Sequence, residues 1–125
     1  MAAAAETIEA FLSEIREPGK PWISPTRFAK RLNLEQQQLA QLAHVHRNTV
    51  TKMPAATSLQ KYLKDAIRVL AAATDLSGDL ERALFWFQNH PLSTFDYQTA
   101  DVLVSQGRAD SVIDYIESLQ AGTGG

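Results

Sequence analysis

The chain of 125 residues contains no cysteine. This absence excludes disulfides, thiolate nucleophiles and Cys-based zinc sites, and it is typical of proteins in a reducing cytoplasm. Long hydrophobic runs are missing too, because no apolar stretch approaches the roughly 18 residues of a membrane-spanning helix. Residues 1–5 are small and apolar, but Glu6 follows them and no basic segment precedes them, unlike a secretory signal peptide. We therefore expect a cytoplasmic protein without a membrane partner.

The residue patterns that catalytic sites require are also scarce. The six glycines stand at turns and at the chain end, and not in a glycine-rich phosphate-binding loop. His44 and His46 are two residues apart, a spacing that does not share a helix face, and no acid or cysteine accompanies them. The sequence shows neither a nucleophile–base pair nor paired carboxylates in a recognisable motif. It predicts a protein that is not an enzyme and has no catalytic residue, no metal and no cofactor.

What the sequence does contain is helical periodicity. Hydrophobic residues make up 45% of the chain, enough for a core, and they recur at helical spacing. Convincing strand alternation, internal repeats and coiled-coil heptads are absent. Proline, glycine and capping residues divide the pattern into segments. We expect an all-α fold with helices near residues 6–16, 25–32, 35–43, 46–52, 58–73, 80–89, 99–106 and 110–122.

The formal charge of −2 hides a strong asymmetry along the chain. Residues 16–68 carry ten Lys and Arg against three acids, a net charge of +7. Residues 69–125 carry two Arg against eight acids, a net charge of −6, and residues 1–15 add −3. This division predicts that the basic part binds a polyanion and that the acidic part binds something else. A chance dipole on a soluble protein is the alternative.

The basic part includes the segment 39–52, LAQLAHVHRNTVTK. Five small or aliphatic side chains with a short break between them are expected to share one core: Leu39, Ala40, Ala43, Val45 and Val50. Two helices joined by a short turn form the helix-turn-helix, whose second helix enters the DNA major groove. The segment resembles the helix-turn-helix of Xre/Cro-like repressors, with His44 where a glycine is usual. That position often needs a positive φ, which His tolerates at some cost. An ordinary helical hairpin is the alternative.

The outward side of the second helix has the residue types that read DNA. Arg pairs with guanine and Asn with adenine, whereas Lys and Thr more often hold phosphates. His46 replaces the Ser or Thr usual at this helix start, which predicts a weaker cap. If the segment is a repressor-like helix-turn-helix, a glutamine at the start of the first helix is placed to donate to a phosphate; a solvated helix face is the alternative. The expected DNA contacts are Gln37, Gln38, His46, Arg47, Asn48, Thr49, Thr51 and Lys52.

Two further features allow more than one interpretation. Phe85, Trp86 and Phe87 are consecutive, so they cover most of a helix circumference and cannot all face one small core. Either this helix lies between two layers or part of the cluster is an interface, where aromatic residues are enriched.

The first expected helix, near residues 6–16, is separated from the rest of the chain by Pro18 and Pro21. It packs either on its own domain or on a dimer partner.

The C-terminal half has a more specific order of features. A Trp-containing helix ends at Pro91, and a loop and a short helix follow. The remaining features in order are Thr99, Ala100, Leu103, Gly107, Val112, Tyr115, Ile116, Leu119, Ala121 and Gly122. This order is similar to the C-terminal domain of Xre/MbcA/ParS-type antitoxins, and the resemblance spans residues 24–122. One departure is Asp96-Tyr97-Gln98 before Thr99-Ala100, where the family has a glycine before a Thr-Pro pair.

The resemblance implies an antitoxin in a type II toxin–antitoxin system. Its partners would be a RES-domain toxin that consumes NAD, whose active site the C-terminal region covers, and the operator DNA of its own operon, bound by a homodimer. The implied domains are an N-terminal helix and linker at 1–20, a DNA-binding domain at 21–76 and a toxin-binding domain at 77–125. The expected toxin contacts are Trp86, Asp110, Asp114, Glu117, Leu119, Gln120 and Gly122. The alternative is a plain helix-turn-helix transcription regulator whose C-terminal domain dimerises or senses a ligand.

Overall fold

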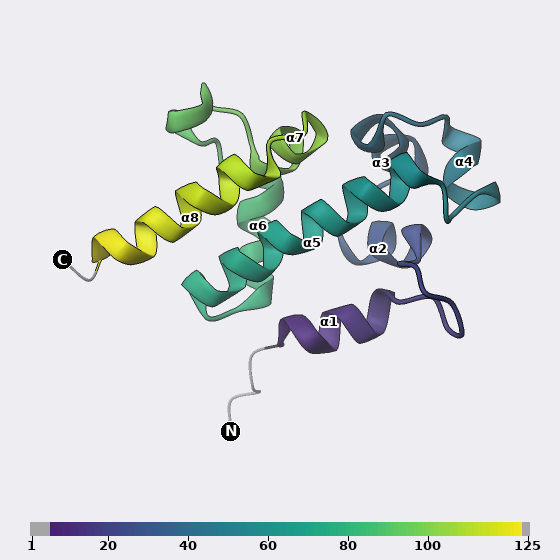
Figure 1. Cartoon of the computed structure of the whole chain (residues 1–125), viewed down its shortest axis with the longest axis horizontal. Coiled ribbons are helices and arrows are strands. Elements are labelled where there is room, and N and C mark those ends of the chain that lie inside the picture. The colour runs from purple at the N-terminus through teal and green to yellow at the C-terminus, as the bar shows by residue number, and fades with distance from the viewer. Residues whose placement is uncertain (1–5, 124–125) are drawn as a thin grey trace. The chain divides into compact units, whose positions relative to one another are not determined.

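The computed structural model describes residues 6–123. Residues 1–5, which were compared above with a signal peptide, and residues 124–125 lie outside this range. Its elements are α1 Ile8–Ile15, α2 Pro25–Arg31, α3 Gln36–Ala43, α4 Arg47–Lys52, α5 Thr57–Ser77, α6 Leu80–Asn89, the 3-10 helix η1 Ser93–Phe95, α7 Ala100–Ser105 and α8 Ala109–Thr123 (Figure 1). Apart from two isolated bridges, no β-structure occurs in the described range. The predicted all-α fold is confirmed.

Packing divides the chain into two compact units. One comprises residues 9–65, and the other comprises residues from Ala66 onward together with those up to Ile8. The division falls inside α5, a continuous helix of 21 residues. The domains expected from the sequence, at residues 1–20, 21–76 and 77–125, were defined by DNA binding and toxin binding. They stay a prediction.

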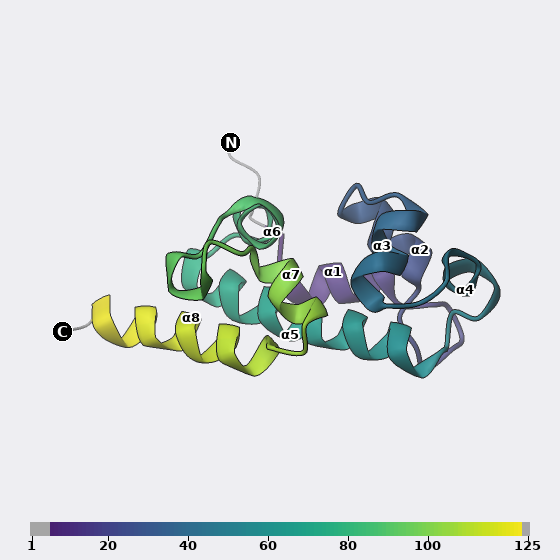
Figure 2. The ribbon, with the colours of Figure 1, turned by 90° about the horizontal axis from the view of Figure 1, so that it is seen from above.

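The unit of residues 9–65 begins its second helix as the sequence predicts. The Ser24 hydroxyl accepts a hydrogen bond from the Arg27 N–H at 3.2 Å, and Pro25 occupies the first helical position. Phe28 is fully buried, together with Phe11 and other side chains of the unit. The helices α2, α3 and α4 pack against one another, which Figures 1 and 2 show as a group of short helices.

Gln60, on α5, is a buried polar residue of this unit, 7% exposed. Its Oε1 accepts from the Ile23 N–H at 3.1 Å, and its Nε2 donates to the carbonyls of Ile23 at 2.8 Å and of Pro54 at 2.7 Å. One amide therefore satisfies three backbone groups from two connecting segments. Buried backbone groups need such partners, so Gln60 joins both connections to α5.

The unit from Ala66 onward is built on α6, α7 and α8, with α7 packed on both of its neighbours. The Asp79 carboxylate accepts from the Glu81 N–H at 3.1 Å, so α6 begins and ends where the sequence predicts. The two ends of the loop after α6 are held together, because the Leu92 N–H donates to the Gln98 carbonyl at 3.0 Å. The two residues form an isolated antiparallel β-bridge. Gly107 has φ +79 at the end of α7, the left-handed cap that the sequence predicts.

Two expectations about α8 are wrong. Leu119 continues the apolar stripe of Val112 and Ile116, and this helical spacing predicts a buried side chain, but Leu119 is 38% exposed. Figure 1 shows the C-terminal turns of α8 extending past α7. Gly122 was expected to end the helix, but α8 continues through it to Thr123. No described helix is both long and apolar enough to cross a membrane.

Candidate functional site

The outward face of α4 is the first candidate surface. Val50 is 1% exposed and is the buried residue of α4, which packs on α2 and α3. With Val50 inward, every other α4 position except half-buried Thr49 is exposed. We call the exposed set the α4 face: His46, Arg47, Asn48, Thr51 and Lys52. The structure thus brings together on one short helix most of the residues expected to contact DNA.

The turn before α4 has the geometry that the sequence requires of it. His44 has φ 57, a left-handed conformation that is uncommon for residues other than glycine. The His44 N–H donates to the Gln41 carbonyl at 3.2 Å, and the Val45 N–H donates to the Ala40 carbonyl at 3.0 Å. These two bonds form a Schellman motif, which satisfies the last carbonyls of α3. The turn therefore redirects the chain into α4 with little freedom.

His46, where the sequence predicts a weaker cap, forms a cap hydrogen bond at the start of α4. Its Nδ1 accepts a hydrogen bond from the Asn48 N–H at 3.1 Å, so the imidazole does the work of a Ser or Thr oxygen. Acceptance at Nδ1 requires the tautomer with its proton on Nε2. The exposed Nε2–H is then a donor available to a ligand.

The glutamines of α3 divide into structural and free side chains. Gln38 Oε1 accepts from the Glu35 N–H at 2.7 Å, and Gln36 Nε2 donates to the Arg47 carbonyl at 2.7 Å. Gln36 therefore ties α3 to the first residue of α4. Gln37 is exposed, and within residues 6–123 its side chain forms no hydrogen bond. Of the two expected phosphate contacts on α3, Gln37 is therefore the one without a structural role.

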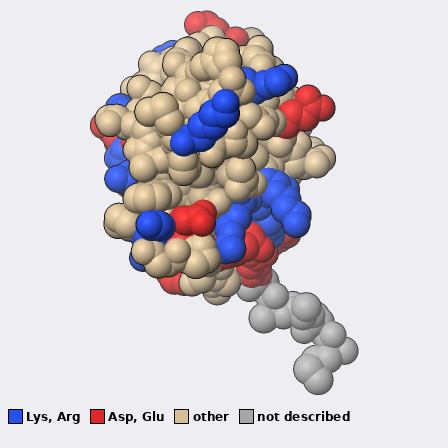
Figure 3. Space-filling model, turned by 90° about the vertical axis from the view of Figure 1, so that its right-hand side faces the viewer, with Lys and Arg blue, Asp and Glu red and all other residues tan. Residues whose placement is uncertain are grey.

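The basic residues of this unit differ in their partners. Arg31 lies 3.7 Å from the Glu14 carboxylate, and Lys61 pairs with Asp65 at 2.7 Å. In each pair one side chain, Glu14 or Lys61, is exposed, so solvent screens the attraction between the charges. Within residues 6–123, the side chains of Arg47 and Lys52 form no hydrogen bond or ion pair. On the face drawn in Figure 3, Lys and Arg form several separate groups with acids among them. On that face the positive charge is distributed and not gathered into one patch.

The second candidate surface is α8, which carries most of the expected toxin contacts. Asp110, Asp114 and Glu117 follow the i, i+4, i+7 spacing that places side chains on one helix face, and all three are exposed. Asp110 accepts from Arg68 at 2.6 Å, so it already has a partner within its unit. The other expected α8 contacts are exposed too: Leu119, Gln120 and Gly122.

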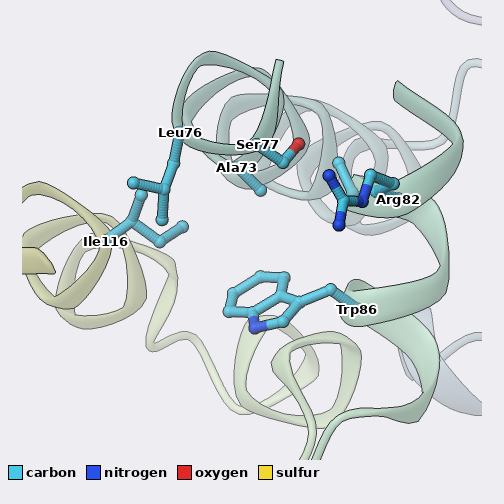
Figure 4. Close-up of a pocket in the computed structure, with 7 residues that line it drawn as sticks. Ala73, Leu76, Ser77, Arg82, Trp86 and Ile116 are labelled. Carbon is cyan, nitrogen blue, oxygen red and sulfur yellow. The ribbon is translucent and has the colours of Figure 1, made fainter. Parts of the chain in front are cut away.

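The three consecutive aromatics of α6 have three different environments. Phe87 is 1% exposed and belongs to the core, whereas Phe85 is 68% exposed. Trp86 is half-buried and lines a pocket of about 410 Å³ between α5, α6 and α8 (Figure 4). The sequence left open whether the cluster is core or interface, and the structure assigns one ring to the core.

Several residues at the surface of this unit were not predicted from the sequence. The pocket beside Trp86 is also lined by Leu76, Ser77 and Arg82, which come from the end of α5 and from α6. Tyr97 is 72% exposed and has φ 63, a strained conformation for an aromatic residue. The departure from the family pattern at Asp96-Tyr97-Gln98 was the available signal for Tyr97. No local signal marked Arg82, because its position depends on how α5 and α6 meet.

The described residues contain no group of three or more His, Cys, Asp or Glu that could hold a metal ion. Comparison of the chain with protein-family models and with curated proteins found no match in either set.

Proposed function

We propose that this chain is an antitoxin that binds operator DNA through the α4 face and neutralises a RES-domain toxin through its C-terminal region. The observation that carries the DNA part is the α4 face itself. Its side chains are exposed, and Val50 holds the helix against α2 and α3. A short helix held by one buried residue behind a tight turn has the form of a recognition helix in a helix-turn-helix.

The chemistry of the α4 face supports sequence-specific recognition. Arg47 and Asn48 lie at the start of α4, the part of a recognition helix that contacts base edges. Arg47 is suited to the O6 and N7 atoms of guanine, and Asn48 to the N6 and N7 atoms of adenine. Lys52 and the Nε2–H of His46 are suited to phosphates, which fix the orientation of the protein on the duplex.

The acidic face of α8 supports the antitoxin part, together with the family resemblance. A toxin pocket that admits NAD, an anionic dinucleotide, is complementary to carboxylates, and opposite charges guide association. Asp114 and Glu117 are exposed on α8 beyond the Arg68–Asp110 pair. Leu119, exposed two residues after Glu117, adds apolar area to the same end of the helix.

The experiment that tests the antitoxin part is a growth assay. The adjacent reading frame is expressed in a heterologous host with and without the full chain, and cell NAD is followed. Growth arrest with NAD loss, reversed by the chain, supports the proposal. The double variant Asp114→Asn with Glu117→Gln, or a chain cut after Ser118, should rescue less well. Asp75→Asn, which removes an exposed acid from α5, is the matched control. A neighbour that is harmless and does not copurify would refute the proposal.

The DNA part predicts a specific role for Arg47. Arg47→Ala should weaken operator binding by about 1–3 kcal/mol because the paired hydrogen bonds to a base are lost. Arg16→Ala, which removes an exposed arginine near the end of α1, is the control. Binding would be measured by fluorescence anisotropy on operator and unrelated DNA at one salt concentration. An equal loss on both DNAs would mean that Arg47 contacts only phosphate.

A plain transcription regulator with a C-terminal dimerisation domain is the second candidate. The observation that favours it is the exposure of Phe85 and Tyr97, at 68% and 72%, on the C-terminal unit. Exposed aromatic residues are enriched at interfaces. In this case Phe85→Ser should give a monomer without operator affinity, and no toxin should copurify.

A further inference from the structure

The pocket beside Trp86 has the size and lining of a small-molecule site. Its volume is about 410 Å³, within the roughly 300–1,000 Å³ typical of ligand pockets. Five of its lining residues are apolar: Ala73, Leu76, Ala83, Trp86 and Ile116. Figure 4 shows the Trp86 ring facing Leu76 and Ile116 across the opening, with Arg82 and Ser77 at the other end. The apolar and polar groups are therefore segregated.

Arg82 is the polar group of the pocket that remains available to a ligand. The Ser77 hydroxyl already donates to the Asp79 carbonyl at 3.0 Å and accepts from the Asp79 N–H at 3.3 Å. By contrast, the Arg82 side chain has no hydrogen bond, ion pair or ring contact within residues 6–123. This contrasts with the other two arginines of the unit, because Arg68 pairs with Asp110 and Arg108 lies 5.1 Å from the Phe95 ring centre.

We propose that this pocket binds a small aromatic carboxylate, with its ring between Trp86 and the aliphatic wall and its carboxylate on Arg82. A guanidinium presents two parallel N–H donors that match one carboxylate. The ring gains offset stacking on Trp86 and burial against Leu76 and Ile116. A cationic ligand is disfavoured by the Arg82 charge. Arg82 is the only cation of residues 75–82, which also contain Asp75, Asp79 and Glu81. A singly charged anion, which one guanidinium neutralises, is therefore favoured over a dianion such as a phosphate ester.

The site goes beyond the proposed antitoxin function and requires neither DNA nor a protein partner. It can therefore be tested on the full chain alone. The probe is indole-3-acetate, and indole-3-acetamide is its uncharged counterpart of nearly equal shape. Binding to the ¹⁵N-labelled protein is followed by the indole Nε1–H resonance of Trp86. A Trp22→Phe variant distinguishes this resonance from that of Trp22, the second tryptophan of the chain.

We expect indole-3-acetate to shift the Trp86 resonance with saturation, and the acetamide to bind at least about tenfold more weakly. Arg82→Gln should lower the acetate affinity by about tenfold, equivalent to about 1.4 kcal/mol, and leave acetamide binding unchanged. Arg108→Gln removes the same charge from the same unit outside the pocket lining and should change neither. Ala73→Leu, which puts a larger side chain into the pocket lining, should weaken both compounds.

Three results would overturn the proposal. They are the absence of saturable binding, equal affinities for the acetate and the acetamide, and an Arg82→Gln variant that binds the acetate like the wild type. If Trp86 responds only when a protein partner is added, the pocket belongs to a protein interface and the small-molecule proposal is wrong. The spectra of each variant report directly whether it is folded.

Discussion

At the scale of single residues, Gln60 carries an unusual share of the structure of residues 9–65. Its amide is the partner of the Ile23 N–H, the Ile23 carbonyl and the Pro54 carbonyl. Because the site is buried, water does not readily replace these bonds. An unsatisfied buried group costs about 1–3 kcal/mol. Gln60 thus fixes the segment before α2 and the segment after α4 at once.

Gln60→Ala should lower the free energy of unfolding by about 1–3 kcal/mol, because three backbone groups lose their partner. Gln60→Glu should also destabilise, since a carboxylate keeps the bond from the Ile23 N–H but cannot donate to the two carbonyls. Gln37→Ala, on an exposed position of α3, should stay within about 0.5 kcal/mol of wild type. Urea unfolding measures all three. Equal stability of the Gln60 and Gln37 variants would contradict this role.

Asp101 is a residue whose environment makes the free energy of unfolding depend on pH. It lies near the start of α7 and accepts from the Thr99 hydroxyl and from the Val102 N–H. Burial raises the pKa of the Asp101 carboxyl above its ordinary value of 3.8, and these hydrogen bonds lower it in part. Between 3.8 and the raised pKa, the folded state binds more protons than the unfolded state. Stability from Asp101 is therefore fully present below pH 3.8 and is lost as pH rises through the folded pKa.

Asp101→Asn should remove this dependence. As the pH rises from 3.8, the wild type should lose stability relative to the variant. Above the pKa of Asp101 in the folded state, the difference in the free energy of unfolding should be constant. The amide oxygen of Asn still accepts from Thr99 and Val102, so the hydrogen bonds are kept. Urea unfolding at a series of pH values measures the difference. A difference that does not change with pH would contradict the effect of burial.

At the scale of secondary elements, three helices end in the same way. Asn33, His44 and Gly107 follow α2, α3 and α7 in the left-handed conformation, with φ 59, 57 and 79. In each case the next residue donates to the carbonyl five positions before it, the longer bond of a Schellman motif. These helix ends depend on a few neighbouring residues. The sequence therefore predicts the left-handed conformation at Gly107 and at His44. These ends make the turns short and fix the direction of the following helix.

Two phenylalanines of α6, Phe87 and Phe85, allow the effect of burial on stability to be measured with the same substitution at a buried and at an exposed position. Phe87→Ala should cost about 3–5 kcal/mol of stability, because it leaves a cavity in the core. Phe85→Ala removes an equal side chain from a position 68% exposed and should change stability by about 0.5 kcal/mol or less. Thermal or urea unfolding distinguishes the two. Similar losses for both variants would mean that Phe85 is buried in solution, as in a dimer.

At the scale of the whole molecule, the charge asymmetry of the sequence corresponds closely to the two compact units. The basic segment 16–68 covers most of the unit of residues 9–65, and the acidic segment 69–125 covers most of the other. Opposite charges on separate units are consistent with two different partners, which is the form of the proposed function. The boundary between the two units lies within α5, which contributes residues to both.

Specific DNA binding should require two copies of the chain. A single α4 face offers few base contacts, and a helix-turn-helix dimer gains affinity by reading two half-sites about one helical turn apart. Inserting about five base pairs between the half-sites should therefore abolish tight binding, because it rotates one half-site to the opposite side of the duplex. Gel-shift titration with spaced operators measures this. Tight binding of a monomer to one half-site would contradict it.

The sequence by itself determined where the helices lie and several of their ends, because these depend on neighbours within a few residues. Ser24, Asp79 and Gly107 act where the sequence predicted, and the helical periodicity gave the all-α fold. Tertiary structure alone decided which aromatic of α6 is buried, what Gln60 binds and where Arg82 lies. These outcomes depend on contacts between residues far apart in the chain, such as Gln60 with Ile23. Periodicity places a side chain on a face, but only the packing of other elements decides whether that face is covered, as the exposure of Leu119 shows.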